Sequence, residues 1–166
     1  MPALYRRAMD ALYLACVAVA GTALVLISAV VPWGVFTRFV LNSASSWTEV
    51  TAVLLTIVLT FFGAAAWYRV SAHMSVTVFV RMLPKLPQWL ARLAAEAFVA
   101  LLGFFMVIWG TRLVEATWEN TIDAFPALSV GVTYLPIPIG GVVTLLFVFE
   151  RVAIGPPPVK PLPGAH

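Results

Sequence analysis

Four long stretches without a charged residue divide this chain, and short segments with charged or polar residues separate them. The stretches cover residues 11–37, 50–68, 97–111 and 124–149, and apolar turns extend the third to about 90–117. A helix rises about 1.5 Å per residue, so about 20 residues cross a hydrocarbon core of about 30 Å. The pattern therefore predicts four membrane spans, over about 11–37, 47–68, 90–117 and 130–152.

The spans and their connections use nearly the whole chain, which leaves no room for an extramembrane domain. The first stretch is too long for a cleaved signal peptide and lacks a clear cleavage site, so we expect it to persist as a span. The prediction is an all-α integral membrane protein with a four-helix transmembrane domain over 1–154. Residues 155–166 (GPPPVKPLPGAH) are proline-rich, and we expect a disordered tail there.

Composition narrows the possible protein classes further. Hydrophobic residues make up 62% of the chain and charged residues 10%, whereas a soluble domain is about 45–50% apolar and about 25% charged. This excludes a soluble globular domain, and so much apolar surface also excludes a disordered chain. The single cysteine, Cys16, excludes an internal disulfide framework and a multi-cysteine metal site.

Basic residues are distributed unevenly between the two expected sides of the membrane. Arg38 and Arg112 fall near one side, and the other eight of the ten lysines and arginines fall at the two termini and between spans two and three. The positive-inside rule therefore predicts that both termini are cytoplasmic. Membrane orientation also explains the net charge of +3 without a nucleic-acid partner.

Prolines mark the connections between the predicted spans. Pro84 and Pro87 bracket a break before span three, which separates residues 74–83 as a short segment of its own. This segment suits either an amphipathic helix at the inner membrane surface or a loop against a partner protein. Pro136 and Pro138 fall at the start of span four, where a helix tolerates a missing N–H group.

Residues that would support transport or catalysis by this chain alone are missing from the sequence. None of the four uncharged stretches has an ionisable group at its centre, which argues against a self-contained pump. Nor does the sequence contain a histidine cluster or a P-loop, HExxH or GxSxG motif. We therefore predict no enzymatic activity and no cofactor.

Small residues recur at helical spacing in the spans, where they let membrane helices approach closely. They are Ala15, Ala18, Thr22, Gly63, Ala66, Ala97, Ala100, Gly103, Gly110, Gly140 and Gly141. Packing within the chain explains part of this set, and we expect the rest to contact another subunit.

Glu49, beside Trp47 at the predicted membrane border, has two possible roles that the sequence does not distinguish. Its carboxylate is either solvated and stabilised by the helix dipole or paired with an arginine of another subunit.

Several short motifs follow one another in a fixed order along the chain. Arg38, Phe39 and Val40 end span one, and Ser46, Trp47, Thr48 and Glu49 begin span two. Next come Phe62, Gly63, Ala64 and Ala65, then Arg69, then His73, Met74, Ser75 and Val76, then Leu83, Pro84, Leu86 and Pro87. Tyr134, Leu135, Pro136, Ile137, Pro138, Ile139 and Gly140 lead into span four.

In this order, over about 5–153, the motifs resemble the small membrane subunit of tripartite ATP-independent periplasmic (TRAP) transporters, the DctQ-like family. Two positions depart from the family pattern, because Val50 and Thr77 stand where the family has or often has an acid. The resemblance implies candidate subunit-interface or structural residues at Arg38, Trp47, Glu49, Gly63, Arg69, His73, Pro84, Tyr134, Pro136, Pro138 and Gly140.

The resemblance also implies a role for the chain. In such systems a periplasmic binding protein delivers an organic acid to a large, sodium-coupled permease subunit in the bacterial inner membrane, and the small subunit braces that permease among the membrane lipids. Two other interpretations stay open on the sequence. One is a stand-alone four-helix carrier or exporter, and the other is a membrane assembly protein.

Overall fold

The computed structural model describes residues 2–43, 46–71, 85–122 and 124–154. Its helices are α1 (Pro2–Phe39), α2 (Ser46–Ser71), α4 (Lys85–Thr117), α5 (Val130–Tyr134) and α6 (Pro136–Ile154). The candidate membrane spans among the described residues are Tyr5–Phe39, Ser46–Val70, Leu93–Thr117 and Val130–Ala153. The predicted helical membrane fold with four spans is confirmed.

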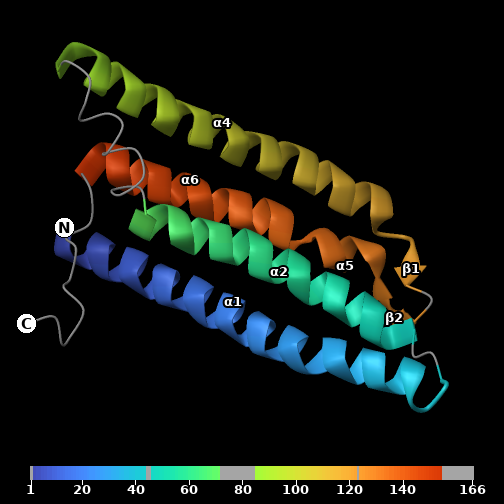
Figure 1. The fold of residues 1–166 in the computed structure, drawn as a ribbon. Helices are drawn as coiled ribbons and strands as arrows, with labels where there is room; N and C mark the ends of the chain where they lie inside the picture. The colour runs from blue at the N-terminus through green and yellow to red at the C-terminus, as the bar shows by residue number, and fades with distance from the viewer. Residues whose placement is uncertain (1, 44–45, 72–84, 123, 155–166) are drawn as a thin grey trace, which may run out of the picture.

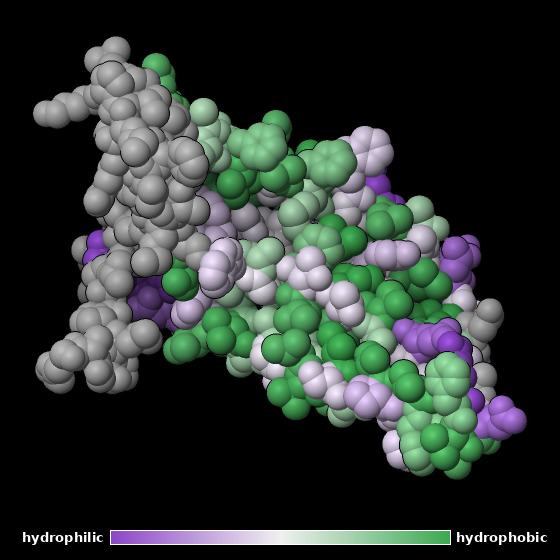
Figure 2. Space-filling view, in the orientation of Figure 1, coloured by the Kyte–Doolittle hydropathy of each residue, from purple (hydrophilic) through white to green (hydrophobic). Residues whose placement is uncertain are grey.

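The spans lie side by side in the order α1, α2, α6, α4, which differs from their order in the sequence (Figure 1). Extensive packing joins α1 to α2, α2 to α6, and α6 to α4. Edge positions are therefore occupied by α1 and α4. An open arrangement of this kind leaves many apolar side chains uncovered, and Figure 2 shows a hydrophobic belt between polar groups at the two ends. Lipid or an apolar partner must cover this belt.

The two ends of the helices differ in what they carry. The start of α1 and the end of α6 lie at one end, which we call the termini end (Figure 1). The α1–α2 connection and the strands β1 (Thr121–Ile122) and β2 (Phe125–Ser129) lie at the opposite end, which we call the hairpin end. The sequence analysis did not predict this antiparallel strand pair.

Span four consists of two helices, whereas the sequence predicted one that begins near residue 130. α5 ends at Tyr134, and Pro136 is the first residue of α6. Proline has no N–H group to donate to the preceding turn, which explains an interruption at this point. Ser129 caps α5 by accepting a hydrogen bond from the Gly131 amide at 3.1 Å.

Glycines permit close contact where α6 packs against its neighbours. A Cβ atom on Gly103 would lie 2.8 Å from Leu145 Cγ, and one on Gly140 would lie 3.0 Å from Phe61 Cβ. Gly110 and Gly141 are similarly crowded in the α4–α6 contact. Packing within the chain therefore explains these four glycines. Gly63 differs, because its nearest such neighbour would be Ala20 Cβ at 3.9 Å.

Two earlier predictions lie outside the described residues. The segment 74–83, with His73 and Pro84 on either side, is one of them, and the tail over 155–166 is another. The boundary between the transmembrane domain and the tail therefore stays a prediction.

α4 begins at Lys85 and has Pro87 in its first turn, a position that accepts proline.

Candidate functional site

At the termini end, a buried arginine joins three helices. Arg69 of α2 forms a two-pronged ion pair with Glu150 of α6, with Nε 3.1 Å from Oε2 and Nη2 3.0 Å from Oε1. Its Nη2 atom also lies 2.8 Å from Oδ1 of Asp10 in α1. The side chains of Arg69 and Glu150 are 7% and 4% exposed, whereas that of Asp10 is 65% exposed. We call Asp10, Arg69 and Glu150 the Arg69 cluster.

Aromatic rings complete the surroundings of this guanidinium. The Cζ atom of Arg69 lies 5.5 Å from the ring centre of Tyr13 and 5.4 Å from that of Phe147. At these separations the negative face of a ring attracts a cation. The buried positive charge is therefore balanced by two carboxylates and two rings, drawn from α1 and α6. An arginine fork suits such planar, two-pronged pairing better than a lysine would.

A second ionic contact lies beside the first and reaches α4. Arg151 Nε of α6 lies 2.8 Å from Glu96 Oε1 of α4, and the hydroxyl of Tyr68 in α2 donates to the other oxygen of the same carboxylate. The Arg151 Cζ atom lies 5.8 Å from the Tyr68 ring centre. We call Tyr68, Glu96 and Arg151 the Glu96 cluster. Together the two clusters connect all four spans at the termini end.

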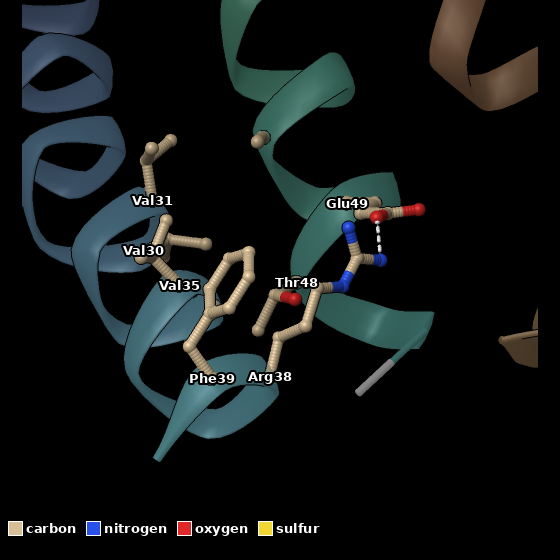
Figure 3. A pocket seen from close by; sticks show the side chains of 9 residues that line it. Val30, Val31, Val35, Arg38, Phe39, Thr48 and Glu49 are labelled. Carbon is tan, nitrogen blue, oxygen red and sulfur yellow. Dashed lines mark hydrogen bonds and ion pairs between the residues drawn. The ribbon is translucent and has the colours of Figure 1, made fainter. Parts of the chain in front are cut away.

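At the hairpin end, Arg38 near the end of α1 pairs with Glu49 in the first turns of α2 (Figure 3). Both side chains are more than half exposed, at 54% and 64%. The sequence left Glu49 either solvated or paired with another subunit, and the structure adds an intramolecular partner that neither interpretation included. An exposed ion pair contributes at most about 1 kcal/mol to stability.

A groove between α1 and α2 begins at this ion pair. Gly34 lies within it, where a Cβ atom would be 3.0 Å from Oγ1 of the buried Thr48, so glycine allows the two helices to meet closely. Its lining is apolar apart from Thr48 and the ion pair. The lining residues are Val30, Val31, Gly34, Val35, Arg38, Phe39, Thr48, Glu49 and Ala52.

Comparison with known proteins decides the family. The family model described as "Tripartite ATP-independent periplasmic transporters, DctQ component" matches residues 27–154, which is most of the chain. This chain belongs to the DctQ family. The DctQ chain is also 28% identical over 141 residues to a curated protein of Haemophilus influenzae named "Putative TRAP transporter small permease protein", and the alignment covers 85% of this chain and 84% of that protein. The family is one of transporter components rather than enzymes.

The structure brings some of the predicted site residues together and separates others. Arg38 and Glu49 are in contact, and Arg69 lies at the opposite end of α2 in its own cluster. Trp47, at the start of α2, is 40% exposed. Pro136 and Gly140 are buried in α6, and Tyr134 and Pro138 are partly buried. The predicted site residues of the DctQ chain are therefore distributed along the helices and form no single centre.

Sequence analysis missed the acids that pair with Arg69 and Arg151. It assigned no role to Asp10, Glu96 or Glu150, and it named Arg69 as a candidate interface or structural residue without identifying a partner for it. A usable signal was available, because three of the four spans carry an acid at the end where basic residues gather. No group of three or more potential metal ligands occurs within the described part of the chain.

Proposed function

We propose that this DctQ chain is the small membrane subunit of a TRAP-type secondary transporter in the bacterial inner membrane. In this proposal it scaffolds a large, sodium-coupled permease subunit that takes up organic acids, such as C4-dicarboxylates or sugar acids, from a periplasmic binding protein. The observation that carries the proposal is family membership combined with the uncharged middle of every span. A chain without charged groups at that depth supports transport and does not itself conduct the solute.

The arrangement of the helices supports the scaffold role. Four spans side by side present a broad apolar face, and the Arg69 and Glu96 clusters tie all four together at the termini end. A permease that moves its substrate site across the bilayer needs a fixed reference in the membrane. Four helices held side by side would enlarge the stationary part of the transporter, which serves as this reference.

We further propose that the termini end is cytoplasmic. The start of α1 and the end of α6 share that end, and most of the basic residues belong to the adjacent segments of the sequence. By the positive-inside rule such an end stays in the cytoplasm. Cysteine labelling tests this orientation: a cysteine introduced in place of Ser43, at the hairpin end, should react with a membrane-impermeant maleimide in intact cells.

Co-purification and reconstitution test the scaffold role. The tagged chain should bring the large subunit out of detergent-solubilised membranes, and uptake of substrate delivered by the binding protein should require both subunits in the same liposomes. The proposal is wrong if this chain emerges alone and the large subunit transports fully without it. Liposomes that contain only this chain separate the scaffold from a stand-alone carrier, because the scaffold should produce no substrate flux.

A further inference from the structure

We propose that the groove beside the Arg38–Glu49 pair binds one zwitterionic phospholipid, phosphatidylethanolamine, from the leaflet at the hairpin end. The scaffold role does not require such a site, and the site does not depend on the scaffold role. Two features of the groove lead to this ligand: a pair of opposite charges at its mouth and an apolar wall of leaflet length.

The charges at the mouth of the groove match the two charges of the headgroup. A guanidinium has five N–H donors, and Arg38 contacts Glu49 through its Nη2 atom. The Arg38 N–H donors that do not face Glu49 suit a phosphate, because the arginine fork matches phosphate geometry. In Figure 3 the second carboxylate oxygen of Glu49 points away from Arg38, so it can accept a hydrogen bond from an ammonium group.

The apolar wall has the dimensions of one leaflet. Val30 and Phe39 mark the ends of the α1 wall, a rise of about 13 Å at about 1.5 Å per residue. Half of a hydrocarbon core of about 30 Å is about 15 Å. Val31, Val35 and Phe39 are exposed, so the other described parts of the chain do not cover them. An acyl chain that runs down from a headgroup at the ion pair would cover them.

Other occupants match the groove less well. Phosphatidylglycerol offers a phosphate to Arg38 but no cation to Glu49. Phosphatidylcholine carries a quaternary ammonium, which has no N–H group to donate to a carboxylate. An apolar helix of a partner protein would cover the valines, but it would offer nothing to the remaining donors of Arg38 or to the second carboxylate oxygen of Glu49, which is costly once the pair loses water.

Native mass spectrometry of the full chain in detergent tests the proposal. Phosphatidylethanolamine, phosphatidylglycerol and phosphatidylcholine with identical acyl chains are added in equal amounts, and the bound lipid is identified by mass. We expect phosphatidylethanolamine to bind most tightly. Arg38→Gln should weaken its binding about tenfold or more, because a charged hydrogen bond to the phosphate is lost. Ala52→Leu, which fills the groove and leaves both charges in place, should weaken binding of all three lipids.

Arg112→Gln is the matched control. Arg112 lies near the hairpin end of α4, with its Cζ atom 5.4 Å from the Trp109 ring centre, and it does not line the groove. This variant should bind phosphatidylethanolamine like the unmodified chain. The thiol of Cys16, which is 2% exposed, should stay unreactive in every folded variant. If Arg38→Gln fails that check, Ala52→Leu and Glu49→Gln test the site instead.

Three results would overturn the proposal. The first is equal binding by the unmodified chain, Arg38→Gln and Ala52→Leu. The second is phosphatidylglycerol or phosphatidylcholine binding as tightly as phosphatidylethanolamine. The third is a cross-link from Ala52→Cys to the large subunit in a complex that has lost the bound lipid, which would make the groove a protein interface.

Discussion

Replacing Glu150 by glutamine tests whether the Arg69 cluster holds the helices together. The substitution keeps the shape of the side chain and removes its charge, which leaves the guanidinium of Arg69, 7% exposed, with Asp10 as its remaining carboxylate. Breaking a buried ion pair by removing one partner costs about 3–5 kcal/mol. Glutamine can still accept a hydrogen bond, so we expect about 3 kcal/mol, the lower end of that range.

A comparison of the two carboxylates on the same arginine sharpens this test. Asp10 is 65% exposed, and Asp10→Asn should cost at most about 1 kcal/mol because water already screens that contact. The double variant Arg69→Met with Glu150→Leu removes both buried charges, and it should recover much of the stability that Glu150→Gln loses. The structure thus predicts that Glu150→Gln lowers stability much more than Asp10→Asn, although both carboxylates contact the same arginine.

The assay follows the single thiol of the chain. Cys16 is 2% exposed, so a thiol-reactive dye that fluoresces on coupling reports when α1 separates from its neighbours on heating in detergent. A loss of about 3 kcal/mol corresponds to a drop of about 6–12 °C in a chain of this length. Equal and small drops for Glu150→Gln and Asp10→Asn would refute the reasoning, because burial would then not determine the strength of the contact.

Three further predictions use the same thermal assay. Gly103→Ala should lower stability by about 1–3 kcal/mol, because its Cβ would lie 2.8 Å from Leu145 Cγ. Gly21→Ala is the control, and it should be neutral or stabilising because a Cβ there would have nothing within 4 Å. Equal effects of the two substitutions would contradict the packing of α4 on α6. Glu96→Gln should cost about 1–3 kcal/mol because its contacts with Arg151 and Tyr68 are only partly exposed, and a change below that range would show that the Glu96 cluster is weak. Glu49→Gln should change stability by less than about 1 kcal/mol because its pair with Arg38 is exposed, and a larger loss would show that the pair is shielded from water.

The number of spans was predictable because it depends on local composition. A stretch of about 20 apolar residues has one stable arrangement in a bilayer, a helix that satisfies its own backbone. The order α1, α2, α6, α4 was not predictable in the same way. It depends on which surfaces fit, and crowded contacts such as Gly103 against Leu145 become visible only when both helices are placed. The α5–α6 interruption lay within reach of sequence reasoning, since Pro136 was already recognised as a helix start.

The ion pairs of the candidate site also differ in how far the sequence could predict them. Arg69 and Glu150 stand 81 positions apart, and neither residue by itself indicates a partner. Their common depth in the membrane was predictable, but their pairing was not, because Asp10 and Glu96 lie at similar depth and carry the same charge. The Arg38–Glu49 contact was easier to anticipate. Only 11 positions and one tight connection separate the two residues, and their charges are opposite.

The position of α4 at the edge has a consequence for biosynthesis. The neighbours that α4 packs against most are α6 and the short α5, and both are made after it. Each new span enters the bilayer as the ribosome extends the chain, so α4 at first lacks its main packing partners and can meet α2 through the Tyr68–Glu96 contact, whereas α1 and α2 can already associate. A chain truncated after residue 129 should therefore hold α1 and α2 together but leave α4 without its main partners and open to quality-control proteases.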